Sequence, residues 1–160
     1  MPAFAPLIDI QLLSGEEFSL RLGEEHRTAG LYYLGIDPRA PDHNCESATG
    51  LARLLAGWMR HLCDPASTQP FYLPFDFADE TTQWLACERS GNMLHAVFGW
   101  APVEGWAISP SDFRQHAHSL PEFTPNEPAF VQSFYLPRLL SDLRRQIGQL
   151  THSQSGGNTE

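Results

Sequence analysis

The sequence of 160 residues contains no lysine, and all ten of its positive charges are arginines. This absence excludes every mechanism that needs a lysine, such as a Schiff base, a Walker-A phosphate loop or a lysine general base. Nineteen carboxylates outnumber the arginines and give a formal net charge of -9. Because phosphate backbones are bound by clusters of basic side chains, this balance argues against a nucleic acid as the main ligand.

Cysteines and long apolar runs are also scarce. The three cysteines, Cys45, Cys63 and Cys87, are odd in number and form no CxxC pair, which is typical of reduced thiols in the cytoplasm. The first residues, MPAFAPLIDIQLL, lack a basic region, and Asp9 interrupts their apolar run, so we expect no signal peptide. No segment reaches the about 20 apolar residues of a membrane span. We therefore expect a cytoplasmic protein that does not contact membranes.

Alternating apolar residues and turn signals predict a fold rich in strands. A turn at residues 90–92 (SGN) separates two apolar segments, as in a β-hairpin. Pro74 lacks the amide that a central strand needs, so its segment is expected at a sheet edge or a bulge. Strands are predicted at 7–13, 16–22, 31–36, 71–77, 81–89, 93–101 and 106–109.

Two segments carry apolar residues at helical period. The first is predicted over 51–62, after a loop at 37–50, and its apolar stripe consists of Leu51, Leu54, Leu55, Trp58, Met59 and Leu62. The second is predicted to begin at Pro137 and carries Leu139, Leu140, Leu143, Ile147 and Leu150 on one stripe. A third, short helix is predicted after residues 109–112 (SPSD). The stretch 131–136 (VQSFYL) fits either a strand or a helix.

Strands mixed with two or three helices, without regular βαβ alternation, indicate an α+β fold. We expect a mainly antiparallel central sheet with the helices packed on it. The length suits a single domain, assigned to residues 1–150. Residues 151–160 have no apolar side chain and are predicted to be a disordered tail.

Candidate metal ligands occur as two H-x-C pairs, His43 with Cys45 and His61 with Cys63. Four such side chains could hold zinc in a tetrahedral site. However, two residues that are two positions apart on a helix point about 200° from each other, and the spacing between the pairs is not a familiar zinc spacing. The sequence therefore favours no metal site.

Candidate catalytic groups are equally isolated. Neither a G-x-S-x-G, HExxH or GxGxxG motif nor a phosphate loop is present. Asp76, Asp79 and Glu80 in the run FDFADE could bind a cation or share acid–base chemistry. A junction between a strand and a turn has the same composition, because aspartates supply turn hydrogen bonds. We assign no catalytic residue and no cofactor.

Charge is distributed unevenly along the chain. Residues 61–113 contain seven carboxylates and a single arginine, Arg89, so they hold -6 of the net -9, together with three of the four tryptophans. Acidic side chains beside aromatic anchors suit the docking of a basic protein, since charge steers the encounter and aromatics supply contact energy. Alternatively, the tryptophans are core residues and the acids a solvated face. The predicted binding residues are Asp76, Asp79, Glu80, Trp84, Glu88, Trp100, Glu104 and Trp106.

In outline the chain resembles the small acidic immunity proteins that are encoded beside bacterial toxins of contact-dependent and type VI systems. The resemblance covers the strands LIDIQLL and FSLRL, the segment LYYLGI with the helix after it, the block FYLPFDFADETTQWL and the ending VQSFYLPRLLSDL. It implies a non-enzymatic inhibitor that covers the active site of a cognate toxin. It carries over no individual residue and no toxin type.

Three hypotheses follow from the sequence. The first is a binding protein of the immunity type with a basic protein partner. The second is a small enzyme or ligand-binding domain with a pocket between the sheet and the 51–62 helix, using His95, Cys87 or the DFADE carboxylates. The third is a structural or adaptor subunit of an oligomer. The sequence does not decide the oligomeric state.

Overall fold

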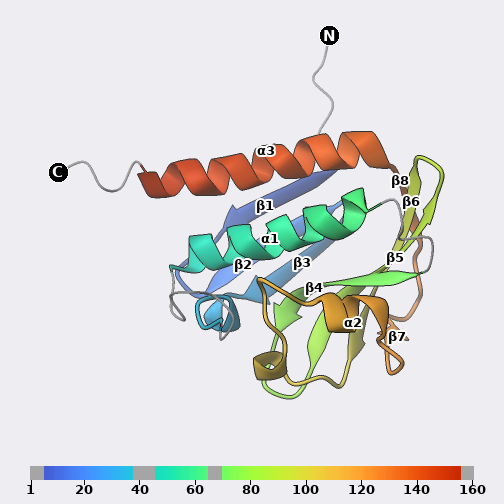
Figure 1. Cartoon of the computed structure of the whole chain (residues 1–160), viewed down its shortest axis with the longest axis horizontal. Coiled ribbons are helices and arrows are strands. Elements are labelled where there is room, and N and C mark those ends of the chain that lie inside the picture. Colours follow the sequence, from blue (N-terminus) through green and yellow to red (C-terminus); the bar gives the residue numbers. More distant parts are fainter. Residues whose placement is uncertain (1–5, 38–45, 65–69, 156–160) are drawn as a thin grey trace, which may run out of the picture.

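The computed structural model describes residues 6–37, 46–64 and 70–155 (Figure 1). The strands are β1 (Ile8–Leu12), β2 (Glu17–Leu22), β3 (Glu25–Gly30), β4 (Phe71–Phe77), β5 (Thr82–Ser90), β6 (Met93–Ala101), β7 (Thr124–Pro125) and β8 (Gln132–Tyr135). The α-helices are α1 (Ser47–Cys63), α2 (Arg114–His118) and α3 (Leu136–Ser155), and two 3-10 turns are η1 (Tyr32–Leu34) and η2 (Gly105–Ala107). The predicted α+β class with antiparallel sheets is confirmed.

The strands form two antiparallel sheets. The first has the order β1-β2-β3, and the second has the order β4-β5-β6, with both β7 and β8 paired to different parts of β6. The β5–β6 hairpin turns at Gly91, whose φ of 60° favours glycine. The register of β4 against β5 shifts between Pro74 and Asp76, which confirms the bulge or edge position expected for the proline.

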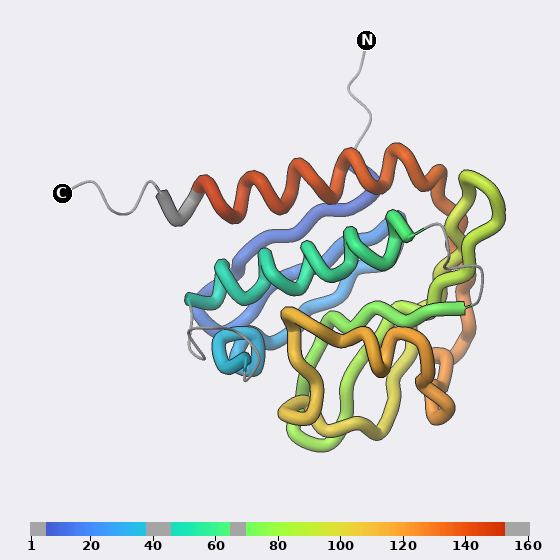
Figure 2. Tube along the Cα trace, viewed as in Figure 1, coloured from blue at the N-terminus to red at the C-terminus, as the bar shows by residue number. Residues whose placement is uncertain are grey.

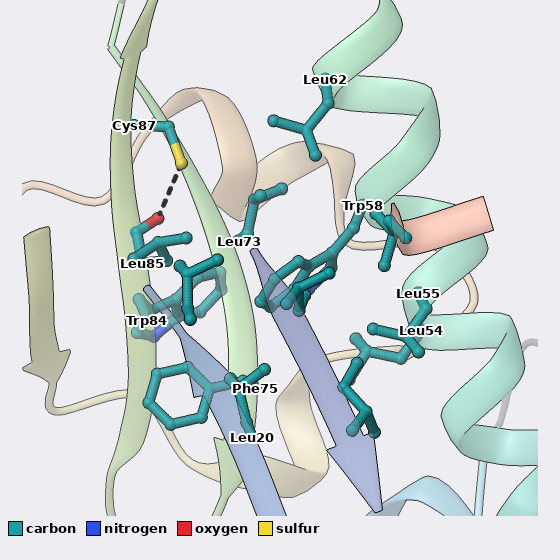
Figure 3. Packing of buried hydrophobic residues seen from close by; sticks show 14 of the residues in the cluster. Leu20, Leu54, Leu55, Trp58, Leu62, Leu73, Phe75, Trp84, Leu85 and Cys87 are labelled. Atoms are coloured by element: carbon teal, nitrogen blue, oxygen red, sulfur yellow. Dashed lines mark hydrogen bonds between the residues drawn. The ribbon is translucent and has the colours of Figure 1, made fainter. Parts of the chain in front are cut away.

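The helices α1 and α3 lie side by side over the first sheet and run in opposite directions (Figure 1). The predicted stripe of α1 is buried except for Met59, which is partly exposed. Leu54, Leu55 and Leu62 point from the helix into the core, toward residues of the second sheet (Figure 3). The indole nitrogen of Trp58 donates to the carbonyl of Pro74 at 2.8 Å, so this helix is also tied to β4.

The second sheet is covered on both faces along part of its length. Its inner face, which carries Leu73 and Leu85, meets the core under α1. On its outer face, the segment after β6 folds back across the strands (Figure 2). There the ring of Phe123 contacts that of Tyr72, and the ring of His116 lies 6.1 Å from that of Trp84.

Helix α3 closes the outer edge of the first sheet. The Asp142 carboxylate accepts the Leu7 amide at 2.8 Å, and Gln146 bonds both the amide of Ile10 and the carbonyl of Ile8. These side chains provide hydrogen-bond partners for β1 on the side where it has no neighbouring strand. An otherwise open edge is thereby blocked against pairing with other chains.

Two predicted strands are wrong. Residues 31–36 contain η1, because Leu31 bonds back to Glu16 and the amide of Leu34 then closes a tight turn on the carbonyl of Leu31. Of residues 106–109, Trp106 and Ala107 belong to η2, and Ser109 forms an isolated bridge with Asp112. Conversely, β3 was not predicted, because its sequence EHRTAG shows little apolar alternation. Its buried side chain is that of Ala29, and the guanidinium of the partly exposed Arg27 lies 4.9 Å above the ring of Phe98.

The helix boundaries also differ from the predictions. Helix α1 begins at Ser47, inside the predicted loop, and the remainder of that loop from 38 to 45 lies outside the described residues. The undecided stretch 131–136 contains strand β8, after which α3 starts at Leu136. Helix α3 then continues to Ser155, so residues 151–155 are helical where a disordered tail was predicted.

Candidate functional site

Two acidic segments meet at one end of the second sheet. The amide of Gly105 donates to the carbonyl of Ala78 at 2.8 Å, and a Cβ at position 105 would lie only 2.5 Å from that oxygen. Glycine is therefore required for this close approach. The contact places Glu104 and Trp106, next to Gly105, beside the β4–β5 turn that contains Asp79 and Glu80.

A third segment joins them through a hydrogen bond. The Tyr33 hydroxyl of η1 donates to the Asp79 carboxylate. This bond, followed by desolvation and by the charges of Asp79 and Glu104, raises the pKa of Tyr33 to about 12. A phenol is protonated at neutral pH even at the ordinary pKa of 10.0, and the shift extends the pH range in which Tyr33 can donate this bond. Residues 46 positions apart in sequence are held together in this way.

The resulting surface is both acidic and aromatic. Asp79, Glu80 and Glu104 are exposed, and no ion pair joins them to any arginine in the described part of the chain. Trp106 is 64% exposed and Tyr32 is 70% exposed, with the ring of Tyr32 packed edge-on against Tyr33 at 5.1 Å. We call this surface the acidic face and define it by Tyr32, Tyr33, Asp79, Glu80, Glu104 and Trp106.

Asp76 is not part of the acidic face, because its carboxylate has a structural role. Its carboxylate accepts the amide of Gly30 at 3.2 Å and the side-chain amide of Gln83 at 3.3 Å, so it links β3 of the first sheet to β4 and β5 of the second. Burial raises the pKa of this carboxyl, and the bond from Gly30 opposes that shift. A predicted binding residue is thus mainly a connection between the two sheets.

Trp84 is completely buried, and its indole nitrogen donates to the Thr82 hydroxyl at 2.6 Å. A side chain in this position cannot contact a partner, so the alternative interpretation of the tryptophans as core residues is correct for Trp84. Trp100 is 40% exposed. It is the cross-strand partner of Gln83, which in turn is the partner of Asp76 on β4. Trp100 is therefore exposed enough to contact a partner, but it lies outside the three segments of the acidic face.

Glu88 is exposed but remote from the other acids. It lies six residues along β5 from Thr82, which corresponds to about 20 Å at the usual strand rise. Its neighbour across the β5–β6 pair is His95. Of the eight predicted binding residues, the structure therefore brings together Asp79, Glu80, Glu104 and Trp106.

Sequence reasoning missed the two tyrosines. Tyr32 and Tyr33 were assigned to a strand, LYYLGI, in which neighbouring side chains would point to opposite faces. In the 3-10 turn, Tyr33 bonds the Asp79 carboxylate instead, and the ring of Tyr32 packs against that of Tyr33. Adjacent tyrosines between two glycines were an available sign of a turn with aromatic side chains at the surface.

The pocket that an enzyme would need between the second sheet and α1 is not formed by the described residues. The described residues between that sheet and α1 leave a void of about 10 Å³, and all of its lining is apolar: Ile8, Leu22, Trp58, Leu62, Leu73, Leu85, Leu94, Leu139 and Leu143. The Cys87 thiol points into the core toward the carbonyl of Leu85 (Figure 3), and burial raises its pKa. His95 lies on the outer face and bonds Ser133 at 2.7 Å. The structure does not bring these groups together with the DFADE carboxylates.

The candidate zinc ligands lie only partly within the described residues. His61 is buried against the rings of Phe113 and His118, whereas His43 and Cys45 lie outside the described residues. Within the described ranges, no three side chains of His, Cys, Asp or Glu are placed to hold a metal ion. Nor does any helix in that part of the chain have the length and apolar character to span a membrane.

No family model matches the chain, and the searches for similar curated proteins and similar solved structures give no match either.

Proposed function

We propose that this protein is a non-enzymatic binding protein that docks its acidic face on a basic surface of another protein, as an immunity-type inhibitor does with its toxin. One observation carries the proposal. Three exposed carboxylates without ion pairs among the described residues stand beside two exposed aromatic side chains, Tyr32 and Trp106, on segments that are fixed to one another.

The chemistry of the face suits a partner rich in arginine or lysine. Carboxylates raise the rate of encounter with a cationic surface, and aromatic rings then supply contact area and cation–π attraction. The bonds from Gly105 to Ala78 and from Tyr33 to Asp79 hold the face in place before binding. Little conformational freedom is then lost on association, which favours affinity.

The experiment compares two variants with equal changes in net charge. The first replaces Asp79, Glu80 and Glu104 by arginine. The control replaces Glu88, Glu122 and Glu127, which are exposed outside the acidic face. Proteins captured from an extract of the source organism are identified by mass spectrometry, and their affinities are measured with the purified partner at several salt concentrations.

We expect the first variant to lose at least tenfold in affinity and the control to bind as the parent protein does. Binding of the parent should weaken as salt rises, because the charges of the face are solvent-exposed. If the partner is a toxin, co-expression of the parent and of the control should protect cells, and the first variant should fail to protect. Full-strength binding by a folded first variant would eliminate the acidic face as the docking surface.

A further inference from the structure

Strand β8 lies at an edge of the second sheet. Its neighbour is β6, with Ser133 opposite His95 and Tyr135 opposite Met93. The amide of Leu136 donates to the carbonyl of Asn92 at 2.8 Å, so the pair 136/92 is a hydrogen-bonded one. Because such pairs alternate along an antiparallel ladder, the pairs at Ser133 and Tyr135 are not hydrogen-bonded to β6. Their amides point away from the sheet.

These outward groups have no hydrogen-bond partner among the described residues. Within residues 6–37, 46–64 and 70–155, no bond is made to the backbone amide of Ser133 or Tyr135. By the same alternation, the carbonyls of Ser133 and Val131 point to the same side, and no bond to them is made from the described part of the chain. Figure 2 shows the chain between α3 and β7, which includes β8, along one margin of the molecule.

Apolar side chains are exposed around this edge. The exposed fractions are 60% for Val131, 54% for Tyr135, 49% for Phe130 and 37% for Met93. Val131 also lines a shallow, mostly apolar depression of about 150 Å³ on the outer face, together with Ala86 and Val97. A free strand edge with apolar neighbours is a template for pairing with another strand.

The edge is free of charge in a chain that is strongly negative. No residue from 128 to 137 is ionisable apart from the hydroxyl of Tyr135, whereas the whole molecule carries -9. Two copies repel each other through most of their surface. They repel least where the edge strand presents only apolar and neutral polar groups, which favours a second copy over a basic protein as the occupant.

We propose that β8 pairs with β8 of a second copy in antiparallel orientation, about a two-fold axis at Ser133. Each Ser133 amide then donates to the Ser133 carbonyl of the other copy, and each Tyr135 amide donates to the other copy's Val131 carbonyl. The pattern is self-complementary, as a two-fold interface requires. It also sets Val131 opposite Tyr135 of the second copy on the outer face, a favourable β-branched and aromatic pair beside the depression.

The test is sedimentation velocity over micromolar to millimolar concentrations with two substitutions at one position. Ser133→Pro removes the outward amide, which the pairing with β6 does not use, so edge proline is compatible with the monomer. Ser133→Ala is the control, because it loses the hydroxyl bond to His95 but keeps the amide. We expect a dimer for the parent and for Ser133→Ala, and at least a tenfold weaker dimer for Ser133→Pro.

Two further variants keep the proposal testable if Ser133→Pro fails to fold. Tyr135→Lys places a charge at the edge and should weaken the dimer at least tenfold, whereas Tyr32→Lys on the acidic face should leave it unchanged. Ser133→Cys should form a disulfide between the two copies under mild oxidation, because a hydrogen-bonded cross-strand pair has a Cα separation of about 5.5 Å. Ser90→Cys serves as the control.

A parent protein that is monomeric throughout the concentration range would overturn the proposal, even if the edge captured a strand of another protein. A dimer that Ser133→Pro and Tyr135→Lys both leave intact would place the interface elsewhere and overturn it equally. Neither result tests the acidic face, because the charge-reversal variants of Asp79, Glu80 and Glu104 change a different surface.

Discussion

Asp76 is a structural carboxylate, in contrast to the exposed carboxylates of the acidic face. We predict that Asp76→Ala lowers the free energy of unfolding by about 1–3 kcal/mol, because the amide of Gly30 then loses its acceptor. Asp76→Asn keeps an acceptor oxygen and removes the partly buried charge, so it should cost much less. Urea unfolding of both variants at neutral pH checks the prediction. Equal losses for alanine and asparagine would mean that the charge, and not the hydrogen bond, matters.

His61 makes stability depend on pH. Its pKa is lowered from the ordinary 6.5, chiefly by burial, then by His118 and Arg60, while Asp64 and Asp112 oppose the shift. Burial also lowers the pKa of His116. The unfolded chain therefore binds protons more readily than the folded protein, so stability is full above about pH 6.5 and is lost as the pH falls below it.

We predict that His61→Gln flattens this dependence, because the variant has no group to protonate at that position. The measurement is the free energy of unfolding from urea titrations on both sides of pH 6.5, with the exposed His152→Gln as the control. A parent protein whose stability rises toward acid in that window would contradict the assignment.

Among the elements, α1 contains a glycine that helix propensity alone does not explain. A Cβ at Gly50 would collide with the backbone carbonyl of Leu34 in η1, whereas a Cβ at Gly148 in α3 would meet nothing within 4 Å. Alanine is favoured over glycine by about 1 kcal/mol in a helix interior. The two glycines therefore lie in the same kind of element but in opposite surroundings.

We predict opposite signs for the same substitution. Gly50→Ala should destabilise the protein by about 1–3 kcal/mol, because η1 has to shift to admit the methyl group. Gly148→Ala should stabilise it by about 1 kcal/mol or less. Thermal unfolding of the two variants under one set of conditions gives the comparison. A stabilising Gly50→Ala would show that η1 is not packed on α1 in solution.

The sequence predicted well those elements whose own residues show a helical or a turn pattern. The stripe from Leu51 to Leu62 and the turn at Gly91 are local signals, and both are correct in the structure. The failures, β3, η1 and η2, are fixed by distant contacts, such as Arg27 on Phe98 and Gly105 on Ala78. Neighbouring residues do not contain that information for β3 and η2, whereas the adjacent tyrosines between two glycines were a local sign for η1.

At the scale of the molecule, charge counting predicted the region that contains most of the acidic face, but not which of its residues lie together. The stretch 61–113 does hold Asp79, Glu80, Glu104 and Trp106, which lie together. Alternation along the strands could not tell that Trp84 is buried and Trp100 is exposed. Trp84 lies on the outer face of the second sheet where that face is covered, and Trp100 lies on the inner face where that face is open. The tyrosines of η1 come from 46 residues away and were beyond a reading of local charge.

The whole chain is also predicted to unfold as one unit, although its strands form two sheets. The apolar side chains of both sheets belong to one continuous core, and the Trp58 bond to Pro74 and the Gly30 bond to Asp76 cross between the parts. Neither sheet can lose its packing without exposing the other.

Two probes of urea unfolding should therefore give coincident transitions. One is tryptophan fluorescence, which reports mainly the buried Trp58 and Trp84, and the other is far-UV circular dichroism. Removing the exposed fluorophore with Trp106→Phe should leave both midpoints in place. Two separated transitions would divide the chain into independent units and contradict the single domain expected for residues 1–150.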